Sequence, residues 1–281
     1  LTALIGLIHN SAISIQVQSN TTDQARFAIN LLVHSCLRKK ASKMRIFSIV
    51  IVMLLSGFAF AQDLEQRLYN AYLDAEMDIW ARYIDSVNWE QASVDERFVI
   101  LNYEYGYAAH AIGAKQDDAA YRLAQFTNHL EAYRAYMDSG VYYCYQTGVC
   151  SFRLSLEKKH IAKQVKGIYN YIERAMAISP NDPFVLAMQG NVEFFNPFFG
   201  SKQKALKYYL KSDSIYHAEG SQYRYPRWNI RAMQMTLLQS MGYTRTKEEV
   251  IQKCDELMAE EPRFSYVTGT FLPAYLKEKK R

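Results

Sequence analysis

Several residue patterns on which enzymes and metal sites depend are missing from this 281-residue chain. It contains no G-x-S-x-G, no phosphate-binding loop and no glycine-rich dinucleotide fingerprint. No two histidines lie four residues apart and H-E-x-x-H is absent, so a metal site would need ligands from separate helices. We therefore expect no catalytic residue, no metal ligand and no cofactor, and predict that the protein is not an enzyme.

An excess of one charge sign is also missing from most of the chain. Six of the 33 basic residues and one of the 28 acidic residues precede Gln62, which leaves 27 of each sign in the remainder. The net charge of +5 therefore belongs to the first 61 residues. Because a nucleic-acid-binding protein needs basic residues on its folded part, we expect no nucleic-acid partner.

The stretch MRIFSIVIVMLLSGFAFAQD, from Met44 to Asp63, has the pattern of a secretory signal peptide. We predict a signal peptide over 44–61, cut after Ala61. Its apolar run is shorter than the ~20 residues of a membrane-spanning helix, and Gln62 in place of cysteine excludes a lipid anchor. We interpret residues 1–43 as non-native upstream translation, with an extended basic n-region as the alternative. The expected product is soluble, exported, and periplasmic or extracellular.

Cysteine is scarce, with Cys144, Cys150 and Cys254 after the signal peptide. In an oxidising compartment Cys144 and Cys150 are a candidate disulfide. Residues six apart on a helix point about 240° apart, so the bridge requires that Gly148 break the helix. The alternative is a pair of buried free thiols on a continuous helix. Cys254 lies on an apolar stripe and is expected in the core.

Apolar residues after Ala61 recur at helical spacing, and no long run alternates at strand spacing. One stripe runs from Leu64 to Tyr83. A second begins at a capping box of Ser93 and Glu96 and continues to Gly113. The sequence therefore predicts an all-α protein.

A repeat is visible in the second half of the chain. Residues 171–195, YIERAMAISPNDPFVLAMQGNVEFF, read as a helix, a turn at Pro180 and a helix with Gly190 at its close contact. Thr246 and Glu249 form a further capping box before a turn at Pro262. This pattern resembles the tetratricopeptide repeat (TPR), although Gln189 and Glu193 stand where that family has apolar residues. The resemblance implies antiparallel helix pairs in a short superhelical array over 158–281, after an N-terminal helical region over 62–157.

A longer stretch carries a second resemblance. Gly190-Asn191, Pro197, Gly200-Ser201 and Ala205 resemble a motif of exported helical-repeat proteins, a family of uncharacterised function. The repeat resemblance implies a non-enzymatic scaffold that binds a protein or peptide segment in its concave face. A fainter likeness is to the accessory ligand-binding component of envelope transport systems, which is the alternative function. A hydrolase that uses Glu104 or Glu193 as a buried carboxylate is a third.

Aromatic clusters near breaks in the helical period supply the candidate ligand or partner surface. Exposed rings on loops beside a helical groove can stack on a ligand. Packing in the core is the alternative role for each of them. The candidates are Phe198, Phe199, Tyr223, Tyr225 and Trp228.

Overall fold

The structure, a computed structural model, describes residues 64–157, 160–196, 200–219 and 225–278. The predicted leader (1–43) and signal peptide (44–61) lie outside these ranges, as do the candidates Phe198, Phe199 and Tyr223. Within the described ranges the regular secondary structure is helical and no β-strand is present, which confirms the predicted all-α class. None of the described helices is long and apolar enough to cross a membrane.

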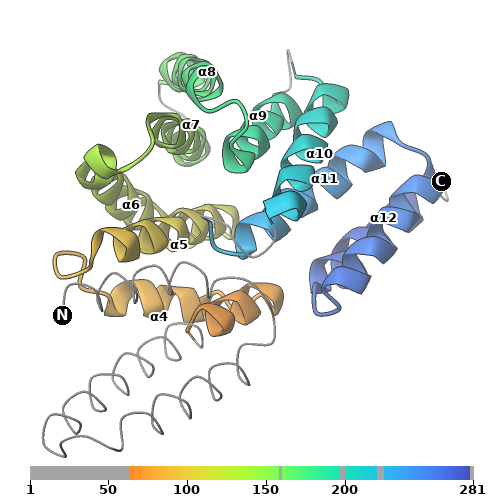
Figure 1. Ribbon diagram of the computed structural model, residues 1–281, viewed down its shortest axis with the longest axis horizontal. Coiled ribbons are helices and arrows are strands. Elements are labelled where there is room, and N and C mark those ends of the chain that lie inside the picture. The colour runs from red at the N-terminus through yellow and green to blue at the C-terminus, as the bar shows by residue number, and fades with distance from the viewer. Residues whose placement is uncertain (1–63, 158–159, 197–199, 220–224, 279–281) are drawn as a thin grey trace, which may run out of the picture. The chain divides into compact units, whose positions relative to one another are not determined.

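The helices from Val94 to Glu260 pack as four consecutive pairs, which gives the predicted array of helix pairs (Figure 1). The type of repeat and the boundary at 157/158 stay predictions. Residues from Arg67 onwards belong to one compact unit, and every contact described below lies within it. The pairs are α5 (Val94–Gly113) with α6 (Ala119–Tyr133), α7 (Ser139–Leu156) with α8 (Ile161–Ile178), α9 (Pro183–Phe195) with α10 (Lys202–Glu219), and α11 (Trp228–Thr244) with α12 (Lys247–Glu260).

Five shorter helical segments complete the unit. Residues 67–73 are helical and precede α4 (Asp78–Ser86), and a 3₁₀ turn over Arg134–Tyr136 follows α6. After α12 the chain forms a π-helix, η2 (Tyr266–Phe271), and then α13 (Leu272–Glu278). The first helices of the four pairs, together with Tyr216 of α10, residues 72–77 and the segment after α12, surround the cavity described below.

Polar residues at the start of several helices set where those helices begin. The predicted capping boxes of α5 and α12 are both present, at Ser93 with Glu96 and at Thr246 with Glu249. Asp182 accepts hydrogen bonds from the backbone of the first turn of α9, where Pro183 occupies a position that needs no N–H donor. These caps confirm the helix starts that the sequence predicts.

The stripe from Leu64 to Tyr83 does not form one helix. The helix ends at residue 73, and Ala75 has a left-handed conformation with φ 61°. The backbone N–H of Ala75 donates to Tyr72 O (3.2 Å) and that of Glu76 donates to Ala71 O (2.8 Å), which is a Schellman C-cap. The break lets Trp80 of α4 fold back and donate its indole N–H to Leu68 O at 2.8 Å.

Gly190 lies at the contact between α9 and α10, as the repeat register predicts. A Cβ atom at this position would lie 2.5 Å from Cε1 of Tyr209, whose ring is fully buried. The missing side chain therefore lets the two helices approach with the tyrosine ring between them. The ring and the glycine form one of the tightest contacts of this pair.

Candidate ligand-binding cavity

A cavity of about 570 Å³ lies in the described part of the chain. Most of its wall comes from the first helix of each pair, α5, α7, α9 and α11. Tyr216 of α10 adds to the wall, and residues 72–77 and 264–270 close one side. These segments are up to about 200 residues apart in the chain, so only the folded array brings them together.

The lining is aromatic and sulfur-rich. Eight aromatic side chains border the cavity, and methionines at four positions lie between them. Among the lining residues that the structure describes, none is Asp, Glu, Lys or Arg. Such a wall suits an apolar ligand, because rings supply stacking surfaces and flexible methionines adapt to the ligand shape. Six of the rings are Tyr72, Tyr105, Phe184, Trp228, Phe264 and Tyr266; the methionines are Met77, Met188, Met233 and Met235.

Trp228 is the predicted candidate that borders this cavity, but it is 5% exposed and lies in a helix, whereas the sequence predicted an exposed ring on a loop. It begins α11 and its ring lies 5.2 Å from that of Trp80, centroid to centroid. Gly106 of α5 makes room for both rings, because a Cβ there would lie 2.7 Å from Trp80 Cζ3 and 2.8 Å from Trp228 Cη2. Sequence reasoning did not assign Gly106; its position inside a helix between Tyr105 and Tyr107 was the available signal.

Tyr225 has a different role from the one proposed for it. It is buried rather than exposed, and its hydroxyl donates to Asp182 Oδ2 at 2.8 Å. Its ring packs 5.2 Å from Phe184 and 5.8 Å from Phe98. Tyr225 therefore holds the start of α9 in place, and its face is not available for stacking on a partner.

His110 is the one titratable imidazole on the described cavity wall. Burial lowers its pKa, so the ring is neutral near pH 7. The side-chain amide of Gln116 lies 3.4 Å from His110 Nε2. A neutral imidazole offers a nitrogen lone pair to a ligand or to a metal carried by a ligand. No group of three or more His, Cys, Asp or Glu in the described ranges is arranged to hold a metal ion by itself.

Cys144 and Cys150 are free and do not form the disulfide considered from the sequence. Helix α7 continues through Gly148, so the two thiols point to different sides of the helix. Cys144 is fully buried and its Sγ lies 3.8 Å from Phe184 O. Burial raises the pKa of both thiols. Cys254 is also buried, as predicted for a core residue.

Neither carboxylate of the hydrolase alternative lines the cavity. Glu104 is 3% exposed and its Oε1 pairs with His129 Nδ1 at 2.7 Å. Burial raises the pKa of Glu104, and the contact with His129 opposes that shift. His129 in turn stacks on Trp89 with ring centroids 4.0 Å apart. Glu193 accepts a hydrogen bond from the backbone N–H of Ser201 at 3.2 Å, which helps to place the start of α10.

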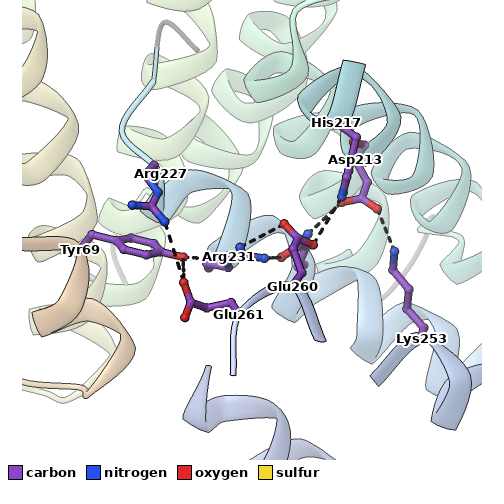
Figure 2. Close-up of polar contacts among 9 residues, drawn as sticks. Tyr69, Asp213, His217, Arg227, Arg231, Lys253, Glu260 and Glu261 are labelled. Carbon is purple, nitrogen blue, oxygen red and sulfur yellow. Dashed lines mark hydrogen bonds and ion pairs between the residues drawn. The ribbon is translucent and has the colours of Figure 1, made fainter. Parts of the chain in front are cut away.

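A polar network anchors the chain beside the cavity (Figure 2). The buried guanidinium of Arg231 donates through Nε to the Tyr69 hydroxyl (2.9 Å) and contacts Glu260 Oε1 through Nη2 (3.0 Å). The Tyr69 hydroxyl donates to Glu261 Oε2 at 3.0 Å. Because Phe264 of the cavity wall comes three residues after Glu261, this network fixes the chain where it enters the wall.

His217 extends this network from α10 to α12 (Figure 2). Its Nδ1 lies 2.7 Å from Asp213 O, and its Nε2 lies 3.4 Å from Glu260 Oε2. The hydrogen bond to the Asp213 carbonyl and the charges of Asp213 and Glu260 raise the pKa of His217, against an opposing effect of burial. Lys253 faces the same aspartate at 3.0 Å, and Arg231 faces the same glutamate. Protonation of His217 therefore ties α10 to α12.

We expect His217 to stabilise the fold in acid and to lose this effect as pH rises. A histidine whose pKa is raised on folding binds its proton more tightly in the native state, so its contribution is full below the ordinary pKa of 6.5 and disappears above the raised value. Unfolding in urea should show wild type more stable than His217→Gln at about pH 5.5, by less than about 1 kcal/mol because the pair is half exposed, and equal to it at about pH 8.5. A difference that grows with pH would contradict this assignment.

A comparison with solved structures gives a structural neighbour of the chain. No protein-family model matches the chain, and no curated protein matches it in sequence. Among solved structures the chain is similar to the HusA haemophore from Porphyromonas gingivalis, with 18% identity and a TM-score of 0.50. The match covers 68% of this chain and 96% of the haemophore. At this identity the similarity shows a shared helical fold.

Proposed function

We propose that the protein is a non-enzymatic binding protein that holds a flat, largely apolar ligand of the tetrapyrrole class, such as haem, in the cavity between its helix pairs. The observation that carries the proposal is the uncharged wall of aromatic rings and methionines. The volume of about 570 Å³ lies within the range of about 300–1,000 Å³ that is usual for small-molecule sites. The haemophore neighbour supports this class of ligand.

The lining also offers the atom types that haem iron accepts. Imidazole nitrogens and methionine thioethers are common axial ligands of haem. His110 is neutral near pH 7, and Met188, Met233 and Met235 lie on the same wall. The described lining has no cation to pair with a carboxylate, so we expect the acidic groups of a tetrapyrrole to remain in contact with water.

A bound peptide, which the repeat resemblance favours, fits this cavity less well. Each peptide unit brings an N–H and a C=O that need partners when they are buried. Most polar groups of the wall already bond to the protein; Thr236 donates to Met233 O and Ser265 donates to Leu73 O. A small flat ligand needs few such partners. We propose that the protein binds its ligand after export through the predicted signal peptide. In the alternative function, it delivers the ligand to an envelope transport system.

Titration with ferric haem and with metal-free protoporphyrin tests the proposal. Trp228 borders the cavity and the buried Trp80 lies 5.2 Å from it, so a bound porphyrin should quench tryptophan fluorescence at a 1:1 ratio, with a Kd of about 1 μM or tighter. Ala232→Arg places a long, charged side chain in the cavity and should weaken binding at least about tenfold. The guanidinium either occupies the space of the ligand or is buried beneath it, and burying a charge costs free energy.

Ala177→Arg is the matched control. Ala177 lies on the exposed side of α8 and does not border the cavity, so this variant should bind as wild type does. Quenching without a 1:1 end point, or equal weakening in both variants, would show that porphyrin binds elsewhere on the surface and would refute the proposal.

A further inference from the structure

Asn191 occupies a distinctive position on the cavity wall. It follows Gly190 in α9, is half-buried and borders the cavity. Because Gly190 has no side chain, the ring of Tyr209 from α10 lies directly against this part of α9. The glycine and the asparagine thus place a tyrosine hydroxyl beside a cavity-lining carboxamide.

The Tyr209 hydroxyl fixes which way the carboxamide points. It donates a hydrogen bond to Asn191 Oδ1 at 2.8 Å, and the ring that carries it is fully buried. A carboxamide has one acceptor oxygen and one NH₂ donor group. With Oδ1 accepting from Tyr209, Nδ2 is the group left to donate to a ligand in the cavity.

Several other donors on the wall are already occupied by the protein. Thr236 and Ser265 donate to backbone carbonyls, and Asn229 Nδ2 lies 3.3 Å from both Asn102 Oδ1 and Pro226 O. The indole N–H of Trp228 has no partner, but the atom is buried beneath the surface and a ligand cannot reach it. The Asn191 amide is therefore a donor that remains available on a largely apolar wall.

We infer that Asn191 is a recognition residue that donates from Nδ2 to an oxygen acceptor on the edge of the bound ligand, and that Tyr209 is the positioning residue that aims it. The inference rests on the proposed function in that it takes the cavity as the binding site. The acceptor is a carbonyl or carboxyl oxygen; in a tetrapyrrole it is a peripheral carboxyl group. The neutral amide selects for a hydrogen-bond acceptor and makes no ion pair.

Two flat probes of equal shape isolate this hydrogen bond. 2-Acetylnaphthalene carries a carbonyl where 2-isopropenylnaphthalene carries a C=CH₂ group, so their affinities differ mainly through the acceptor. Wild type should bind the ketone about 3- to 10-fold more tightly, the range that one net hydrogen bond supports. The affinity of 2-naphthoate, compared with that of the ketone, shows whether the site binds a charged acceptor as tightly as a neutral one.

The ratio of the two affinities is the readout, because a general loss of packing weakens both probes equally. Asn191→Leu should bring the ratio to about one while binding of the isopropenyl compound is kept. Tyr209→Phe should give an intermediate ratio, because its carboxamide can rotate. A wild-type ratio of one, no binding of either probe, or an unchanged ratio in Asn191→Leu would overturn the inference.

The two proposals fail separately. If the ratio behaves as expected and porphyrins do not bind, the recognition residue stands and the tetrapyrrole class is wrong. If porphyrins bind and the two naphthalene probes bind with equal affinity, the cavity is the binding site and Asn191 does not donate a hydrogen bond to the ligand.

Discussion

Replacing Gly190 with leucine should destabilise the protein by about 1–3 kcal/mol, towards the upper end of the usual range for overpacking. Even the first added atom would lie 2.5 Å from the ring of Tyr209, which is fully buried and held by its bond to Asn191. Relief requires that α9 and α10 separate. Thermal unfolding should show the loss as a fall in melting temperature of about 2–4 °C for each kcal/mol.

Gly113→Leu is the matched control for this experiment. Gly113 is also helical, and a Cβ there would have no heavy atom within 4 Å. Leucine is favoured over glycine in a helix by up to about 1 kcal/mol, so this variant should be as stable as wild type or more so. An increase in the melting temperature of Gly190→Leu would mean that the helix register is wrong.

Gly106→Ala should reduce porphyrin affinity at least about tenfold while the protein stays folded, because a small steric change next to a preformed site is strongly felt. The added methyl group would lie 2.7 Å from Trp80 and 2.8 Å from Trp228. Trp80 is fully buried and hydrogen-bonded to Leu68 O, so it cannot yield. Trp228 borders the cavity and must move into the space that the ligand would occupy.

Fluorescence titration of Gly106→Ala beside Gly113→Ala checks this expectation. Both changes replace a glycine of the same helix with alanine, but only the first meets a ring. Wild-type affinity in Gly106→Ala would show that Trp228 does not form the wall that contacts the ligand.

Local features of this fold can be predicted from the sequence because each is encoded within a few residues. The capping boxes at Ser93 and Thr246 and the close contact at Gly190 are of this kind. The break after residue 73 was missed because the left-handed residue of its cap is Ala75, not the glycine that usually signals such an end.

The candidate site is less predictable because it depends on contacts between distant segments. Trp228 was selected for its place near a break in the helical period, and it does border the cavity. Tyr225 was selected on the same ground, but it bonds to Asp182, packs against Phe184 and does not border the cavity. The pairing of Glu104 with His129 joins two helices, and nothing in either local sequence indicates it.

The two ends of the described unit are fastened to each other. Tyr69 bonds to Glu261, Ser265 donates to Leu73 O at 2.7 Å, and Arg263 pairs with Asp74 at 2.5 Å. Linear repeat arrays fray from their terminal units, since each end has a neighbour on one side only. Here residues 69–74 and 261–265 contact each other, so neither segment can unfold without breaking these contacts. We therefore expect the amide hydrogens of both segments to exchange as slowly as those in the middle of the array.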